Sequence, residues 1–288
     1  MCLCAAEAQR RGYTPVIIDT EGAWTGDFVS RWGMDPKNML YLYTPWVDEI
    51  NVALGQIIDS GDQKLCIILD SIGGMEALKL LDDAVKGDVK ADQGTLQKKI
   101  KRTLKMILNI CKQQNSIALA SGHYYGNPSG YGDADQVGGG KFAKLAPDVI
   151  IALKKSKMYD KDKNVIGNAI TAITLKNRFY PPFNEALVEI DYKNGINSMA
   201  GLVPLAIEAG LIEKGGAWYT NTVTGDKVQG ELNAEKCIDE SLLKKLDEFI
   251  ANTGYSTINE HVAAAVLASE SSENNQTIDN EVNEVKIV

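Results

Sequence analysis

Three short apolar runs constrain the fold of this chain most. Pro15–Asp19 (PVIID), Leu65–Asp70 (LCIILD) and Ser116–Ser121 (SIALAS) lack the polar alternation of half-exposed strands. Such runs are typical of strands buried on both faces of a parallel sheet. Between them, Asp48–Ser60 and Gly94–Asn115 have apolar residues at helical spacing. The pattern predicts an α/β fold, a central mainly parallel sheet with helices on both faces.

The pattern changes after Gly140. Val149–Leu153, Ala169–Lys176 and Leu187–Tyr192 lie close together in the sequence, and a charged turn, Asp160–Asn164, separates the first two. This spacing predicts an antiparallel extension of the sheet.

Three parts are expected along the chain. Residues 1–197 form the core, residues 198–255 form a small α+β C-terminal domain, and residues 256–288 form an acidic, disordered tail because Ser, Asn and acidic residues dominate there.

Composition excludes several classes of protein. The 288 residues are 44% hydrophobic and 24% charged, and the longest apolar runs are too short to span a bilayer. With no secretory signal, a cytoplasmic protein without a membrane partner is expected. The five cysteines form no CxxC pair, which favours reduced thiols. A net charge of −8 argues against a generally basic nucleic-acid binder, but the tail holds six acidic residues against one lysine, so basic faces on the body remain possible.

Acidic and hydroxyl side chains follow two of the predicted strands. Asp19 and Glu21 end the first, and Asp70 and Ser71 end the second. Ligands of α/β sheets bind beyond the carboxyl ends of the strands, so these four residues should converge on one crevice. Either aspartate alone fits a helix cap equally well.

A phosphate-binding loop would be expected beside such carboxylates. The motif GxxxxGK[ST] does not occur, and Gly138–Lys141 (GGGK) has the wrong spacing. The chain instead opens with an amphipathic helix, MCLCAAEAQRRG, that runs into the first strand. In P-loop folds the N-terminus of that helix holds the phosphates. We therefore expect the loop to be missing, through a truncated gene, a split gene with a companion fragment, or true loss.

Four segments resemble the RecA family of DNA strand-exchange recombinases, which includes bacterial RecA and phage UvsX-type proteins. They are QRRGYTPVIIDTEGAW, CIILDSIGG, ITLKNRFYPPFNEALVEIDYKNGIN and GLIEKGGAWYTNTVTGDKVQG. The resemblance covers about residues 1–250 and implies a RecA-like P-loop NTPase core with ATP and Mg²⁺ as cofactors.

The resemblance assigns roles on the nucleotide side. Glu21 matches the glutamate that activates the attacking water, and Asp70 and Ser71 match the magnesium-site pair, with Asp70 holding Mg²⁺ through water. Phe28 matches an aromatic residue placed against adenine. His123 stands where most members carry a glutamine that senses the γ-phosphate, and a ring nitrogen can form the same hydrogen bond.

Lys176 and Arg178 are separated by one residue at a predicted strand end, so both side chains leave the same face. Alone, the pair fits a solvated basic edge. In the family, a basic pair at this position reaches the ATP of the neighbouring subunit and couples hydrolysis to filament assembly.

Lysines also line one predicted helix. Lys98, Lys101 and Lys105 recur at i, i+3 and i+7, and Lys99 and Arg102 widen this stripe. Alone, the stripe fits a solvated face.

The resemblance implies a DNA-binding surface that includes the stripe. Contacts to phosphate would suit a sequence-tolerant recombinase, and tyrosines in the second of two DNA-binding loops (residues 76–93 and 124–137) could stack on bases. The implied DNA-binding residues are Lys98, Lys101, Lys105, Tyr124, Tyr125, Gly139, Gly140, Lys154 and Lys155.

Two functions follow as expectations. The first is an ATP-dependent recombinase that forms filaments on single-stranded DNA and exchanges strands with a homologous duplex. Its DNA-dependent ATPase would be weak or absent without a phosphate-binding loop. The alternative is a non-catalytic RecA paralogue or fragment that binds DNA or modulates filaments. The acidic tail could compete with DNA or only aid solubility.

Overall fold

The computed structural model describes residues 1–59, 63–79, 85–86, 94–126, 135–160, 162–253 and 284–287. Two compact units are present. The first contains residues 1–151 and 280–288, and the second contains residues 152–279. The domain boundary expected at residue 197 stays a prediction.

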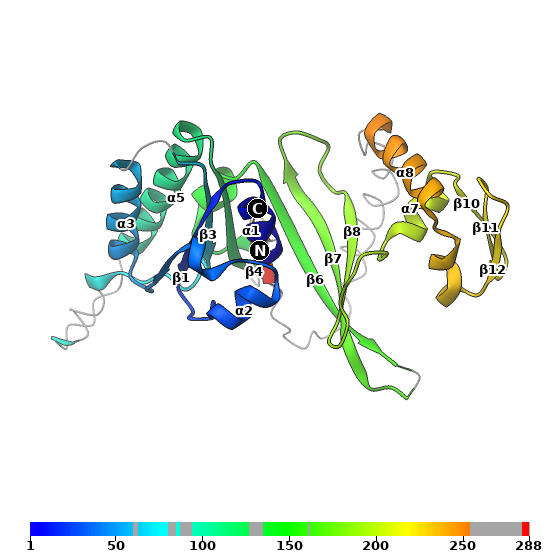
Figure 1. The fold of residues 1–288 in the computed structure, drawn as a ribbon. Coiled ribbons are helices and arrows are strands. Elements are labelled where there is room, and N and C mark those ends of the chain that lie inside the picture. The colour runs from blue at the N-terminus through cyan, green and yellow to red at the C-terminus, as the bar shows by residue number, and fades with distance from the viewer. Residues whose placement is uncertain are drawn as a thin grey trace. The chain divides into compact units, whose positions relative to one another are not determined.

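The first unit is built on parallel strands in the order β2-β1-β3-β4 (Figure 1). The register places Asp19 of β1 beside Asp70 of β3, so the two strands end at the same level. The elements of this unit are α1 (Cys2–Arg10), β1 (Thr14–Asp19), α2 (Gly26–Arg31), η1 (Pro36–Asn38), β2 (Leu40–Tyr43), α3 (Val47–Asp59), β3 (Leu65–Asp70), α5 (Thr95–Gln113), β4 (Ile117–Gly126), β5 (Asp135–Val137), α6 (Lys141–Leu145), the start of β6 (Val149–Tyr159) and β13 (Glu284–Ile287).

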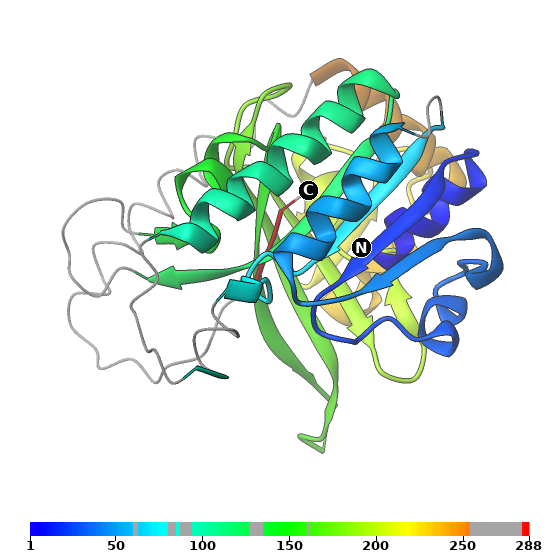
Figure 2. The same cartoon turned by 90° about the vertical axis from the view of Figure 1, so that its left-hand side faces the viewer.

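Helices cover both faces of this sheet, as the sequence predicts. Side chains alternate between the faces of a strand. Ile17 of β1 packs with α1 in one buried cluster, whereas Val16 and Ile18 line an apolar groove with residues of α3. Figures 1 and 2 show α3 and α5 side by side, and the two helices are in contact. Burial on both faces explains why β1 and β3 read as unbroken apolar runs.

The second unit has an antiparallel part and a smaller α+β part. Strand β7 pairs antiparallel with β8, and β8 pairs antiparallel with β9, which confirms the predicted extension. Strands β10 to β12 form a separate antiparallel sheet that packs with α7 and η2. The elements are the rest of β6, β7 (Val165–Asn177), β8 (Glu185–Asp191), β9 (Gly195–Asn197), α7 (Leu202–Glu208), β10 (Ile212–Gly215), β11 (Trp218–Asn221), β12 (Lys227–Gln229), η2 (Glu231–Cys237) and α8 (Glu240–Thr253).

Three further sequence expectations can be compared with the structure. All five cysteines are free, as predicted. Within the described ranges, no helix is both long and apolar enough to cross a membrane. Within the tail that the sequence predicts to be disordered, residues 284–287 form β13, which pairs antiparallel with β4. The remainder of residues 256–288 lies outside the described residues.

Gly74 lies in the turn after β3, where the backbone packs closely against Thr20. A Cβ atom at Gly74 would lie 3.0 Å from Cβ of Thr20 and closer still to its hydroxyl, which accepts a hydrogen bond from the Ser71 N–H. We expect Gly74→Ala to lower the free energy of unfolding by about 1–3 kcal/mol through overpacking. Gly26→Ala, with open space at its Cβ position, should change it by less than about 0.5 kcal/mol. Equal urea midpoints for both variants would contradict this.

Candidate functional site

Asp19 organises the loop that follows β1. Its side chain is fully buried, and one carboxylate oxygen accepts hydrogen bonds from the backbone N–H groups of Glu21 (3.0 Å) and Gly22 (2.8 Å). The other oxygen accepts from the Trp24 N–H and the Tyr41 hydroxyl, both at 3.0 Å. The expectation that Asp19 faces a crevice is therefore wrong. Asp19 is a buried anchor, whereas Glu21, two residues later, is exposed.

The same hydrogen bonds set the protonation of this anchor. Burial raises the pKa of Asp19, but the backbone N–H groups and the Tyr41 hydroxyl outweigh burial, so the pKa lies below its ordinary value. Burial and the Asp19 carboxylate together raise the pKa of Tyr41 to about 12. Asp19 is thus held ionised and Tyr41 neutral around neutral pH.

A network of side-chain hydrogen bonds holds the carboxylate of Asp70 and, separately, that of Glu21. Ser121 donates its hydroxyl to one oxygen of Asp70, and the indole N–H of Trp24 donates to the other at 2.8 Å. The Ser71 hydroxyl donates to Glu21 at 2.6 Å, and the peptide bond between Asp70 and Ser71 is cis. Side chains from β3, from β4 and from the loop after β1 therefore meet at the level where β1 and β3 end.

His123 and Phe28 border this network. The His123 ring packs against Gly73, where an added Cβ would lie 2.9 Å from the ring carbon Cδ2. Phe28, on α2, is 39% exposed and meets the Trp24 ring edge-to-face, with centroids 6.2 Å apart. The structure thus brings together all five residues predicted for the nucleotide side, although their roles remain predictions.

The donor set at this end of the sheet fits Mg²⁺. Asp70, Glu21 and Ser71 offer carboxylate and hydroxyl oxygens, which Mg²⁺ prefers, and Mg²⁺ commonly uses one or two carboxylates and keeps several waters. In the part of the chain that the structure describes, no cluster of three or more His, Cys, Asp or Glu side chains forms a metal site. A closed protein cage is therefore not what these residues build.

Lys176 and Arg178 lie at the end of β7 in the second unit. Lys176 is half-buried, and Arg178 is exposed just beyond the strand. The Asn177 side chain accepts hydrogen bonds from the backbone N–H groups of Phe179 (3.0 Å) and Tyr180 (3.2 Å), which fixes the chain immediately after the pair.

The lysine stripe on α5 is mostly as predicted. Lys98, Lys101 and Lys105 are exposed, and the ammonium groups of Lys101 and Lys105 lie 5.8 and 6.0 Å from the ring centroid of Phe142. Lys99 is an exception, because its ammonium group is 2.6 Å from a carboxylate oxygen of Asp48 on α3. Lys99 therefore does not widen the stripe as expected.

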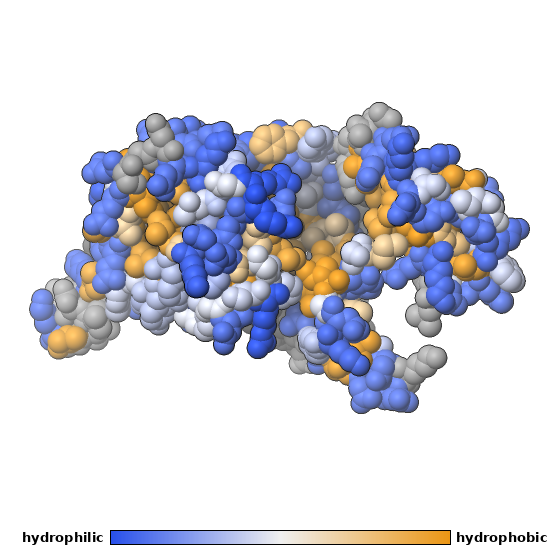
Figure 3. Space-filling model, in the orientation of Figure 1, coloured by the Kyte–Doolittle hydropathy of each residue, from blue (hydrophilic) through white to orange (hydrophobic). Residues whose placement is uncertain are grey.

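The other predicted DNA residues are only partly described. Lys154 and Lys155 are exposed on β6, in the second unit. Tyr124 and Tyr125 lie on β4, but their side chains are outside the described part of the chain, as are residues 80–84, 87–93 and 127–134 of the two predicted loops. Figure 3 shows mostly hydrophilic residues on the visible face, with hydrophobic residues in small groups.

Gly139 and Gly140 have a structural reason to be glycine. Their φ angles are +92° and +80°, and a Cβ at Gly140 would lie 2.6 Å from the Gln97 side-chain oxygen. Their close approach to DNA stays a prediction.

A protein-family model matches more than half of this chain. The model described as the RecA N-terminal domain matches residues 2–197. The chain belongs to the RecA family. Protein RecA of Lactobacillus delbrueckii subsp. bulgaricus is 27% identical over 240 residues, which are 82% of this chain and 70% of that protein. Protein RecA of Chlorobaculum tepidum is 27% identical over 252 residues, covering 86% and 69% of the two chains.

The matched share of the other protein differs between relatives. Protein RecA of Lactiplantibacillus plantarum is 27% identical over 240 residues, and the match spans 61% of that protein. Among solved structures, a RadB recombinase is 15% identical, with a TM-score of 0.47 over 67% of this chain and 83% of that one.

Sequence reasoning missed two residues of the site. Trp24 and Ser121 hold the Asp70 carboxylate, from 46 and 51 residues away. The only signal was their position, Trp24 shortly after the first predicted strand and Ser121 at the end of the third.

Proposed function

We propose that this protein is an ATP-dependent DNA recombinase that forms filaments on single-stranded DNA and catalyses homologous pairing and strand exchange. Membership of the RecA family supports a role in DNA recombination. The observation that carries the finer proposal is that Glu21, Asp70, Ser71 and His123 lie close together where β1 and β3 end beside β4.

Each residue has a chemical task in this proposal. Asp70 and Ser71 would hold the hydrated Mg²⁺ ion, which when bound would neutralise charge on the phosphates. Glu21 accepts a proton from the attacking water. His123 donates a ring N–H towards the γ-phosphate, and Phe28 stacks on adenine.

Lys176 and Arg178 complete the site of another subunit in the filament. Cations placed in this way stabilise the charge of the transition state and raise rates by about 10³–10⁵ in related phosphoryl-transfer enzymes. Hydrolysis would then depend on filament assembly, and ATP would favour the state that holds DNA.

The alternative function is a non-catalytic relative that binds DNA or modulates filaments. Residues 1–288 contain no GxxxxGK[ST], the motif that supplies phosphate-directed amides, a lysine and a magnesium-bound hydroxyl. A fusion that supplies such a loop ahead of Met1 separates the two. We expect ATP hydrolysis stimulated by single-stranded DNA, together with strand pairing, whereas no stimulation would favour the non-catalytic function.

The basic stripe on α5 gives a separate prediction for DNA binding. Replacing Lys98, Lys101 and Lys105 with glutamine should weaken binding to single-stranded DNA, and should reduce the dependence of log K on log salt by about 0.7 for each lost phosphate contact. Fluorescence anisotropy with a labelled oligonucleotide between about 50 and 200 mM salt measures this.

Lys37→Gln provides the control, because Lys37 is an exposed lysine on η1, outside α5. It should leave the slope unchanged. If the triple variant had the same slope of log K against log salt as the wild type, the stripe would not belong to the DNA-binding surface.

A further inference from the structure

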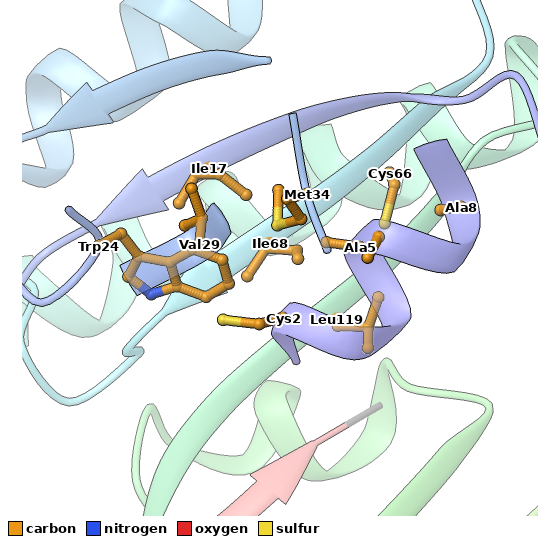
Figure 4. Packing of buried hydrophobic residues seen from close by; sticks show 11 residues of the cluster. Cys2, Ala5, Ala8, Ile17, Trp24, Val29, Met34, Cys66, Ile68 and Leu119 are labelled. Atoms are coloured by element: carbon orange, nitrogen blue, oxygen red, sulfur yellow. The ribbon is translucent and has the colours of Figure 1, made fainter. Parts of the chain in front are cut away.

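Trp24 is buried in the core at the point where the site begins. Only 4% of the residue is exposed, and its ring belongs to a cluster that includes Cys2, Val29 and Ile68 (Figure 4). Its backbone N–H is fixed by Asp19, at 3.0 Å. Both the backbone and the ring of Trp24 are therefore held in place before any ligand arrives.

The one polar atom of this ring faces the proposed metal site. The indole N–H donates to an oxygen of Asp70 at 2.8 Å. A buried indole N–H needs a partner, but a phenylalanine would fill the same core without that need. The N–H group therefore contributes a hydrogen bond to Asp70 in addition to the packing of the ring.

Asp70 is held from two sides. Trp24 donates to one carboxylate oxygen, and the Ser121 hydroxyl donates to the other. An ionised carboxylate has about four acceptor positions, so the two donors fix its rotation while leaving positions for the water shell of a cation. Groups that orient a metal-site carboxylate in this way commonly change metal affinity by 10–100-fold when they are removed.

The direction of the N–H is itself fixed by α2. Phe28 meets the Trp24 ring at an interplanar angle of 84°, and Thr25 caps α2 by accepting from the Phe28 N–H at 3.2 Å. The indole is thus clamped between the core cluster and the first turn of α2.

We propose that Trp24 is a positioning residue of the metal site, which fixes the Asp70 carboxylate through its indole N–H in the orientation that receives the hydrated cation. This inference rests on the proposed function, because it takes Asp70 as the magnesium-site carboxylate. Trp24 itself touches neither the cation nor the reacting atoms.

The first measurement needs no metal. In ¹⁵N-labelled chain, the indole resonance of Trp24 is assigned by its absence in Trp24→Phe. We expect Asp70→Asn, which removes the charge from the acceptor, to move the Trp24 indole proton upfield, with no comparable change at Trp32, Trp46 or Trp218. An unchanged Trp24 resonance would overturn the proposal.

The second measurement is Mn²⁺ binding in the presence of ATP, which is measured by electron paramagnetic resonance. Trp24→Phe should weaken Mn²⁺ binding about tenfold. Trp32→Phe is the matched control, since Trp32 packs against the same cluster, and it should bind Mn²⁺ as the wild type does. Equal affinities of the two variants would overturn the positioning role.

The two measurements distinguish a failure of the proposed metal site from a failure of the positioning role of Trp24. A wild-type chain that binds no Mn²⁺ would count against the metal site of the proposed function, and the indole resonance would then decide alone whether Trp24 holds Asp70. That resonance also decides if Trp24→Phe does not fold, because Trp32→Phe, Trp46→Phe and Trp218→Phe then assign it by elimination and Asp70→Asn leaves Trp24 in place.

Discussion

Replacing Glu21 with glutamine is expected to lower the rate of ATP hydrolysis, stimulated by single-stranded DNA, by about 10²–10⁴-fold in a fusion that supplies a phosphate-binding loop. Glutamine keeps the size of the side chain and an oxygen that can accept the 2.6 Å hydrogen bond from Ser71. It cannot accept a proton from the attacking water. The loss should therefore fall on the rate constant and leave DNA affinity and the fold unchanged.

Glu213→Gln is the control for this experiment. Glu213 is an exposed carboxylate on β10, outside the residues proposed to bind nucleotide or DNA. The control should hydrolyse ATP at the rate of the parent fusion. A Glu21→Gln variant that does the same would mean that another group activates the water.

The strands that carry this site were predictable because their burial leaves a strong pattern. β1 and β3 begin and end within one residue of the predicted apolar runs, since both strands are covered on two faces. The edge strand β2 was missed. Three of its four residues are exposed, so Leu40–Tyr43 shows no simple pattern of burial.

The partners of individual side chains were not predictable, because they depend on contacts between distant segments. Asp19 and Glu21 are both strand-end carboxylates in the sequence, and only the Tyr41 hydroxyl and the backbone of residues 21–24 show which one is buried. In the same way, Lys98 and Lys99 are neighbours in the sequence. The side chain of Lys99 bonds to Asp48, which is 51 residues away, so Lys99 does not belong to the exposed stripe.

Asp19 is expected to give the largest effect on stability. Asp19→Asn keeps the shape of the side chain. Four N–H and O–H donors converge on the Asp19 carboxylate. The NH₂ group of asparagine would therefore face donors and could not accept their hydrogen bonds. We expect the free energy of unfolding at pH 7 to fall by about 2–3 kcal/mol, the size of a hydrogen-bond loss at a buried charged group. Urea denaturation followed by tryptophan fluorescence measures this change.

The pH dependence of that difference follows from the pKa of Asp19. Burial raises this pKa, but the four donors outweigh burial and hold it below the ordinary value of 3.8. A carboxyl group with a lowered pKa in the folded state contributes stability above its unfolded pKa, and loses that contribution as the pH falls through its folded value. The gap between wild type and Asp19→Asn should therefore be constant from about pH 7 to 5 and narrow below about pH 4. Asp59→Asn, at an exposed position at the end of α3, should change stability by less than about 0.5 kcal/mol at every pH. A gap that stays constant to the acid limit would show that the donors around Asp19 stabilise the loop without depending on its charge.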